Sequence, residues 1–317
     1  MGRWQTLKRV LTDREYRSIR LAKAGFYNYL SDQDYIAKQY RVRMGRELNL
    51  DDPQLFSEKL QWLKLHDHNP FYTQLVDKYR VREYIAEKIG EEYLIPLLGV
   101  WDDPEDIDFD ALPDQFVLKC NHNSGTGMCI CRDKSKLNID AVKKGLRKGL
   151  RENFYKRCRE WPYKDVPRKI IAEKFMASKS AETSTNGLDD YRFYCFQGEP
   201  EMVYVYQAGT LEFGNKPGIA SCDIFDISWN HFPFRQKSPP APSAPPRPAN
   251  FDKMLAISRS LSQGIPFLRV DFYDIDGQLY VGELTLYPGG GFAPFNPPEW
   301  DQKIGSWLTL PHNDSKQ

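Results

Sequence analysis

The chain of 317 residues has no long apolar run, no excess charge of either sign and few cysteines for its length. No apolar segment approaches the ~20 residues of a membrane-spanning helix, so we expect no membrane span. The 44 basic residues balance 43 acidic ones, and this balance favours neither nucleic acid nor a membrane surface as a partner. The first twenty residues are basic but lack the apolar core of a signal peptide.

The six cysteines are scattered through the sequence. In a chain of this size they do not form a disulfide framework, which favours reduced thiols and a cytoplasmic protein. Cys129 and Cys131 are two residues apart, but no second Cys/His pair stands at ligand spacing, which argues against a zinc site. The length allows two or three packed subdomains, and no internal repeat is present.

Helical patterns dominate the first hundred residues. In "QLVDKYRVREYIAEKIG", apolar residues from Val81 to Ile89 recur at helical spacing, and Gly90 is placed to end the helix. In "LFSEKLQWLKLHD", Ser57 is placed to cap a second helix. Farther along, the strongly basic segment 140–160 predicts one long helix. Residues 233–248 contain seven prolines and predict an extended, solvated loop.

The stretch "FVLKCNHNSGTGMCICRD" (116–133) predicts a strand ending near Lys119, a glycine loop and a returning strand. A Walker A motif is excluded because its lysine follows the glycines, whereas Lys119 precedes them. The G-x-G-x-x-G dinucleotide motif is absent as well. A hairpin turn remains one interpretation. A phosphate cradle is the other, since successive backbone N–H groups can surround an anion and Lys119 can add a positive charge.

The stretch "PFLRVDFYDIDGQLYVGELTLYPGGG" (266–291) predicts a hairpin. A two-residue loop, 276–277, would put Asp271 and Glu283 on opposite sides of the sheet. A three-residue loop, 275–277, would put both carboxylates on one face together with Arg269 and Thr285. Two adjacent carboxylates suit Mg²⁺, which binds one or two of them plus phosphate oxygens. A solvent-facing strand with Arg269 neutralising both acids is equally consistent with these residues.

Three elements occur in one order: the strand with Lys119 and its glycine loop, then "IIAEKFM", then "RVDFY…GELTLYPGGG". Together they resemble the ATP-grasp superfamily. Over about residues 50–310 the chain is similar to the TupA-like ATP-grasp family of bacterial surface-polysaccharide and teichuronopeptide biosynthesis. The resemblance implies an α+β fold in which two subdomains clasp ATP. The expected parts are a mainly helical region 1–97, a small subdomain 98–175 with the glycine loop, and a C-terminal subdomain 176–317 with the metal site.

The resemblance also implies roles for individual residues in binding the cofactors ATP and Mg²⁺. The residues expected at the nucleotide are the phosphate-binding Lys78 and Lys119, the loop residues Asn121, Ser124, Gly125 and Gly127, the adenine-binding hinge Glu173, Lys174, Phe175 and Met176, and the ribose-binding Asp190. The residues expected at the metal are Asp271, Glu283 and Thr285. The residues expected to act in catalysis are Lys119, Arg192 and Arg269, with Arg192 at the γ-phosphate and Arg269 at the oxyanions.

The sequence departs from the superfamily at two places. Most ATP-grasp ligases carry Asn two residues after the metal-binding Glu, where this chain has Thr285, so a second strong Mg²⁺ site is not implied. ATP-grasp enzymes commonly start with a Rossmann-like substrate domain, whereas residues 1–70 are predicted to be helical. The docking place of the carboxylate substrate therefore cannot be carried over.

The activity that the resemblance implies is ATP-dependent carboxylate–amine ligation through an acyl phosphate. The implied substrates are an amino acid and a uronic acid or acidic peptide of a surface polysaccharide, with peripheral contact to a lipid-linked glycan. A nucleotide-sugar glycosyltransferase is the alternative, because Asp106-x-Asp108, Asp108-x-Asp110 and Asp274-x-Asp276 match its D-x-D metal motif. Turn chemistry also explains these aspartates. A binding protein without activity and a kinase that stops at phosphoryl transfer are the other interpretations.

Overall fold

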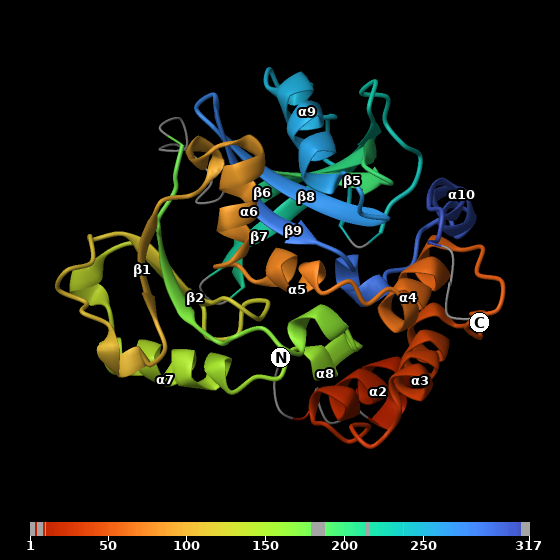
Figure 1. The fold of residues 1–317 in the computed structure, drawn as a ribbon, viewed down its shortest axis with the longest axis horizontal. Coiled ribbons are helices and arrows are strands. Elements are labelled where there is room, and N and C mark those ends of the chain that lie inside the picture. The colour runs from red at the N-terminus through yellow and green to blue at the C-terminus, as the bar shows by residue number, and fades with distance from the viewer. Residues whose placement is uncertain are drawn as a thin grey trace. The chain divides into compact units, whose positions relative to one another are not determined.

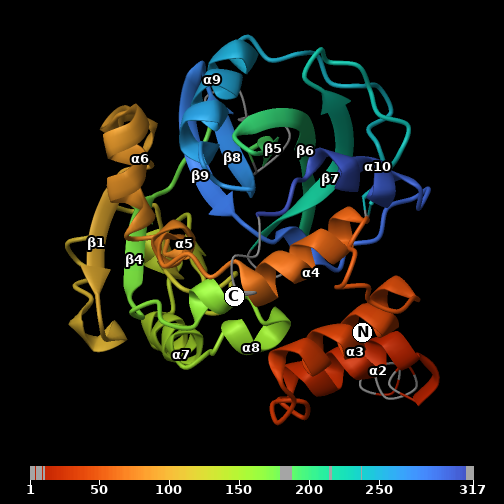
Figure 2. The ribbon, with the colours of Figure 1, turned by 45° about the vertical axis from the view of Figure 1, so that its right-hand side comes forward.

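A computed structural model describes residues 4, 9, 11–178, 188–213, 216–236 and 238–311. The chain divides into two compact units. The first comprises residues 1–69, 153–164 and 287–317, and the second comprises residues 70–152 and 165–286. Figures 1 and 2 show the helices and strands of both units. None of the described helices is long and apolar enough to cross a membrane.

The first unit is helical. Its elements are α2 (Arg14–Lys23), α3 (Asp32–Met44), α4 (Phe56–His66), α8 (Tyr155–Cys158), the 3₁₀ turns Trp161–Tyr163 and Pro288–Gly291, and α10 (Trp300–Trp307). Helix α4 begins at Phe56, so Ser57 lies inside the helix and is not the predicted cap. The Ser57 N–H instead donates to the carboxylate of Asp301, at 2.9 Å, and the Ser57 hydroxyl donates to the same carboxylate. A buried side chain of α10 thus caps α4.

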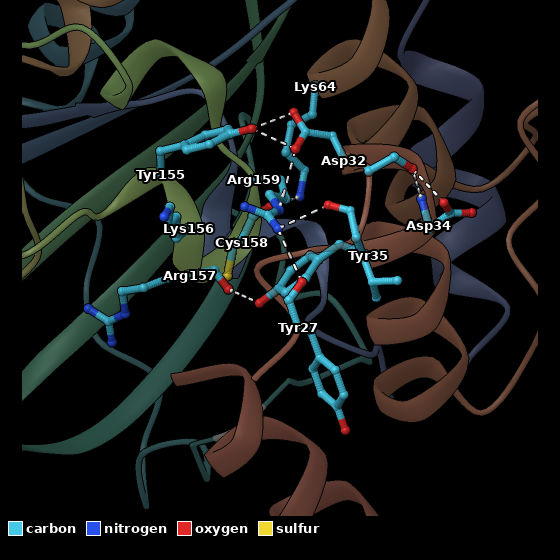
Figure 3. Close-up of polar contacts among 12 residues, drawn as sticks. Tyr27, Asp32, Asp34, Tyr35, Lys64, Tyr155, Lys156, Arg157, Cys158 and Arg159 are labelled. Atoms are coloured by element: carbon cyan, nitrogen blue, oxygen red, sulfur yellow. Dashed lines mark hydrogen bonds and ion pairs between the residues drawn. The ribbon is translucent and has the colours of Figure 1, made fainter. Parts of the chain in front are cut away.

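The predicted helix 140–160 is two helices, α7 (Ile139–Leu150) and α8, with a break between them. Helix α8 ends at Cys158 and is followed by Arg159, whose guanidinium lies over the Tyr35 ring at 4.4 Å. In the same cluster the Tyr155 hydroxyl donates to Asp32 (Figure 3). These long-range contacts within the first unit outweigh the helical pattern of the basic segment.

Lys64 of α4 is a buried lysine in this cluster. Its ammonium donates to the carbonyl oxygens of Cys158 (2.9 Å) and Gly290 (2.8 Å) and lies 4.4 Å from the centre of the Phe292 ring. Burial lowers the pKa of Lys64 to about 8. The charged and the neutral form of the lysine side chain both carry N–H groups, so either form can donate to these two carbonyl oxygens.

We expect stability to rise with pH between about 8 and the ordinary lysine range because of Lys64. In that window the unfolded chain holds a proton that the folded protein has released, so the free energy of unfolding increases by up to about 1.4 kcal/mol per pH unit. Urea unfolding at several pH values should show this rise in the wild type and a flatter profile in Lys64→Met. Parallel profiles for the two proteins would contradict the expectation.

The second unit contains two antiparallel sheets. The small sheet has the order β1-β4-β2-β3, and its strands are β1 (Leu97–Trp101), β2 (Phe116–Cys120), β3 (Cys129–Cys131) and β4 (Ile170–Lys174). The large sheet has the order β7-β6-β5-β8-β9, and its strands are β5 (Asp190–Phe196), β6 (Glu199–Phe213), β7 (Lys216–Asp226), β8 (Phe267–Ile275) and β9 (Gln278–Thr285). The helices of this unit are α5 (Phe71–Val76), α6 (Val81–Ile89), α7 and α9 (Phe251–Ser262). Gly90 ends α6, as the sequence predicts.

Each sheet has one face covered by a helix. Helix α7 packs on the small sheet (Figure 1), where buried side chains such as Phe116 and Leu118 form a core with Leu146. Helix α9 packs on the large sheet (Figure 2), where Phe251 contacts Phe193. Because side chains alternate along a strand, the opposite faces carry the polar residues discussed below.

The hairpin β8–β9 has the two-residue loop Asp276-Gly277, since Ile275 pairs with Gln278. Both loop residues have positive φ, as such a tight turn requires. From the sequence, a shared face for the two carboxylates was expected only with a three-residue loop. In the structure the two carboxylates share a face because a bulge at Gly282 shifts the register, so Asp271 pairs with Glu283.

The proline-rich loop lies along β7, the edge strand of the large sheet. The Cys222 N–H donates to the carbonyl of Pro239 at 2.9 Å, and the Ala241 N–H donates to Asp223 at 3.0 Å. The loop is bound to the sheet by these hydrogen bonds rather than only solvated, whereas its extended conformation stays a prediction. Proline has no N–H to offer a further strand, so the loop also blocks pairing at this edge.

Candidate functional site

One cavity in the second unit brings together four of the charged residues singled out in the sequence. Its walls come from α5, α6, β2, β4 and β9 and include Lys78, Arg82, Lys119, Glu173 and Glu283. Apolar side chains complete the walls. These residues are up to 205 positions apart in the sequence (283 − 78 = 205), so only the fold brings them together.

Lys119 points away from the α7 side of β2 because it alternates with the buried Leu118 and Cys120. Its ammonium lies 2.6 Å from Oε2 of Glu173 on the neighbouring strand β4. The other oxygen of Glu173 lies 3.8 Å from the guanidinium of Arg82. Glu173 therefore holds two cations at one wall of the cavity.

Lys78 lies in the short connection between α5 and α6, which the sequence pattern had joined. Its ammonium donates to the carbonyl of Asn123 in the glycine loop (2.9 Å) and lies 3.3 Å from Oε1 of Glu283. Lys78 thus links the loop to the carboxylates of the large sheet.

Asp77, which was not among the residues predicted from the sequence, positions Lys78. The Asp77 carboxylate is buried and accepts hydrogen bonds from the Asn121 side chain (2.8 Å) and from the Tyr79 N–H (2.9 Å). Asn121 is buried too, and its side chain also bonds Pro167 and Lys169. The signal was the Asp in "VDKY", because aspartate commonly bonds the backbone two residues on.

The glycine loop packs directly on α7. Gly127 has φ +78°, and a Cβ there would lie 2.6 Å from the Gly145 carbonyl oxygen. A Cβ at Gly149 would lie 2.6 Å from the Thr126 carbonyl oxygen. The helix glycines therefore allow the loop backbone to approach. The loop's exposed and half-buried part comprises residues 124–128.

We expect Gly149→Ala to destabilise the protein by about 1–3 kcal/mol, because the new methyl group displaces the loop or the helix. Gly145→Ala is the matched control on the same helix. Its Cβ would meet nothing nearer than the Gly127 Cα at 3.9 Å, so the better helix propensity of alanine should stabilise by up to about 1 kcal/mol. Urea unfolding measures the stability of both variants, and equal changes in the free energy of unfolding would contradict the close packing of the glycine loop on α7.

Asp271 and Glu283 lie side by side on the polar face of the large sheet. Arg269 binds both oxygens of Asp271, with Nε 2.6 Å from Oδ1, and its Nη2 lies 3.4 Å from Glu283. Burial raises the pKa of Asp271 to about 6, against the opposing charges of Arg269 and Arg192. Burial also raises the pKa of Glu283, but Lys78 and Arg269 outweigh it and hold the value at about 2.

This pair fits a Mg²⁺ ion that takes its remaining ligands from phosphate and water. Asp271 and Glu283 are in register, and Thr285 stands opposite Arg269. Within the described ranges, no group of three or more His, Cys, Asp or Glu residues could hold a metal. The donors therefore suit Mg²⁺ better than a metal that needs an all-protein cage.

Arg192 and Asp190 of β5 lie on the same face as Asp271. Arg192 binds Oδ2 of Asp190 at 2.7 Å, lies 3.7 Å from Asp271 and covers the Tyr206 ring at 4.2 Å. Their predicted roles at the γ-phosphate and the ribose stay predictions.

The predicted adenine hinge divides between two places. Glu173 lines the first cavity, while Lys174 and Phe175 line a separate groove with Arg132. The Lys174 N–H donates to the Pro96 carbonyl at 2.9 Å. Met176 is half-buried beyond the end of β4. Adenine binding by these residues stays a prediction.

The fold of the chain is the ATP-grasp fold, an α+β class, as the resemblance implied. The chain belongs to the TupA-like ATP-grasp family, because the family's sequence profile matches residues 58–309. ATP-grasp enzymes use ATP and Mg²⁺, and the charges around the cavity suit both. No curated protein matches the chain.

Several solved ligases are similar in fold. The ATP complex of D-alanine–D-alanine ligase from Bacillus anthracis is 15% identical at a TM-score of 0.38, over 72% of this chain and 55% of that chain. The enzyme from Helicobacter pylori is 15% identical at 0.40, over 74% and 61%. The ADP complex of N5-carboxyaminoimidazole ribonucleotide synthetase is 13% identical at 0.43, over 81% and 58%. This chain spans about three fifths of the length of these proteins.

Proposed function

We propose that the protein is an ATP-dependent carboxylate–amine ligase. One observation carries the proposal: Lys78 and Lys119 converge on the same cavity as Glu283, which stands in register with Asp271. Two cations for a polyphosphate and two carboxylates for a divalent cation are what phosphoryl transfer requires.

In the proposed reaction a carboxylate oxygen of the first substrate attacks the γ-phosphorus of ATP. The bond to the β–γ bridging oxygen breaks, and ADP leaves. The amine nitrogen of the second substrate then attacks the carbonyl carbon of the acyl phosphate. Inorganic phosphate leaves, the nitrogen loses a proton, and an amide has formed.

The chain's own residues would bind and orient these groups. Lys78 and Lys119 would hold the phosphates, and the exposed part of the glycine loop would exclude water that hydrolyses an acyl phosphate. Arg269 would stabilise the negative oxygen of the tetrahedral species. Asp271 and Glu283 would hold Mg²⁺, which offsets charge on the transferring phosphoryl group when bound.

For substrates we propose an amino acid and a uronic acid or acidic peptide of a bacterial surface polysaccharide, in keeping with the family. Glycosyl transfer is less well supported, since two of the D-x-D aspartates have turn roles. Asp108 accepts the N–H groups of Asp110 and Ala111, and Asp276 occupies a tight turn at positive φ.

The test is ADP release by the purified protein, screened across amino acids and uronic-acid sugars, with product masses. Substrate-stimulated ADP release with a new amide supports the ligase. A phosphorylated product without an amide would show a kinase. Turnover of a nucleotide sugar without ADP release would overturn the proposal.

We place the reaction in the cytoplasm, where ATP is available and thiols stay reduced. All six cysteines are free of disulfides. Contact with a lipid-linked glycan would use the exposed cations of α7, namely Lys144, Arg147 and Lys148. Cosedimentation with anionic vesicles tests it, and equal sedimentation with neutral vesicles would count against it.

A further inference from the structure

The cations of the candidate site are paired with its carboxylates. Lys119 pairs with Glu173, Lys78 with Glu283, and Arg269 with Asp271. A polyphosphate that binds the cations, or a divalent cation that binds the carboxylates, must therefore replace one partner of an existing ion pair. The pairing decides whether binding of one ligand changes the affinity for the other.

The two lysines differ in the role of their partners. Glu173 lies on the small sheet, where its ion-pair partners are Lys119 and Arg82, and it is not a member of the metal pair. Glu283 is half of the metal pair. Lys78 lies at its Oε1 and Arg269 at its Oε2, so both oxygens already have a cation.

The side chain of Lys78 can move away from Glu283 while the backbone at Lys78 stays in place. Its backbone N–H donates to Asn121, and the neighbouring Asp77 holds the turn. The ammonium itself is at the end of a flexible stem, and the side chains of Lys78 and Glu283 are 17% and 34% exposed. Arg269, by contrast, is buried and bound by two bonds to Asp271.

We propose that Lys78 couples the two ligands of the site: it holds Glu283 until a phosphate group draws its ammonium away, so phosphate binding frees Oε1 of Glu283 for a divalent cation. The inference rests on the proposed function, since it uses the assigned phosphate and metal sites. By linkage, the divalent cation strengthens phosphate binding by the same factor.

The direct test is Mn²⁺ binding to nucleotide-free protein, measured by the electron paramagnetic resonance signal of free Mn²⁺. Lys78→Met removes the competing charge and keeps the apolar stem. We expect it to bind Mn²⁺ about tenfold more tightly than the wild type, within the usual range of such couplings. Lys119→Met is the matched control, because it removes a phosphate-site lysine whose partner is not a metal ligand. It should leave Mn²⁺ affinity unchanged.

Equal or weaker Mn²⁺ binding by Lys78→Met would overturn the proposal, and so would equal tightening by Lys119→Met. Lys78→Gln serves in the same comparison if Lys78→Met is unstable to urea. A second readout is the gain in melting temperature on adding Mn²⁺, which should be larger for Lys78→Met than for the wild type.

The proposed function fails in a different way. If it is correct, both lysine variants weaken the binding of a non-hydrolysable ATP analogue, measured by calorimetry without a divalent cation. Unchanged analogue binding in both variants, with Mn²⁺ tightened only in Lys78→Met, would overturn the ATP site and leave only the competition between Lys78 and a divalent cation for Glu283. Weakened analogue binding in both variants, with unchanged Mn²⁺ affinity, would support the ATP site and overturn the coupling by Lys78.

Discussion

Replacing Glu283 with glutamine should lower the rate of ATP turnover by about 100- to 1,000-fold, the usual loss when one electrostatic group of an active site is removed. The amide cannot supply the charge that a divalent cation needs, and it removes the ion pair with Lys78. Lys119→Ala should cause a loss of similar size by removing a phosphate cation. ADP release is measured with the substrate pair that gives the highest wild-type rate.

Glu87→Gln provides the control for Glu283→Gln. Glu87 is an exposed residue of α6, so the same chemical change there should leave the rate within experimental error. Circular dichroism and urea unfolding establish that each variant is folded. Wild-type turnover in both Glu283→Gln and Lys119→Ala would refute the assigned site.

Asp301→Ala should have the largest effect on stability, about 3 kcal/mol of unfolding free energy. The Asp301 side chain is 1% exposed and accepts the N–H and hydroxyl of Ser57 as well as the guanidinium of Arg46. Its removal leaves the buried N–H of Ser57 unpaired, which costs about 1–3 kcal/mol, and breaks a partly buried ion pair with Arg46.

Asp252→Ala is the control for Asp301→Ala, because it breaks the surface ion pair with Arg247. Such pairs contribute at most about 1 kcal/mol, so this variant should unfold close to the wild type in urea. Similar losses for the two variants would mean that burial and capping do not decide the contribution of Asp301.

The strands that carry the candidate site were predictable from the sequence. Alternation of Leu268, Val270 and Phe272 with Arg269 and Asp271 predicts the two faces of β8, and Figure 2 shows this strand inside the large sheet. Local patterns succeed here because a strand's period of two depends only on neighbouring residues.

The register of the hairpin was not predictable, because a one-residue bulge moves every later side chain to the other face. The two-residue turn alone predicts opposite faces for Asp271 and Glu283, and the bulge at Gly282 brings them to one face. The break of the basic helix has a similar cause. Contacts of Arg159 with Tyr35 and Asp32, more than a hundred residues away, stabilise a conformation that helical spacing does not favour.

By itself the sequence determined the type and order of the elements around the site, the helical first part and the residue types able to bind phosphate and Mg²⁺. Only the tertiary structure decided which charges meet: Lys78 with Glu283, Lys119 with Glu173 and Asp271 with Arg269. The physical reason is range. Propensity and alternation act over a few residues, whereas an ion pair needs two side chains within about 4 Å and depends on sheet order, register and one bulge.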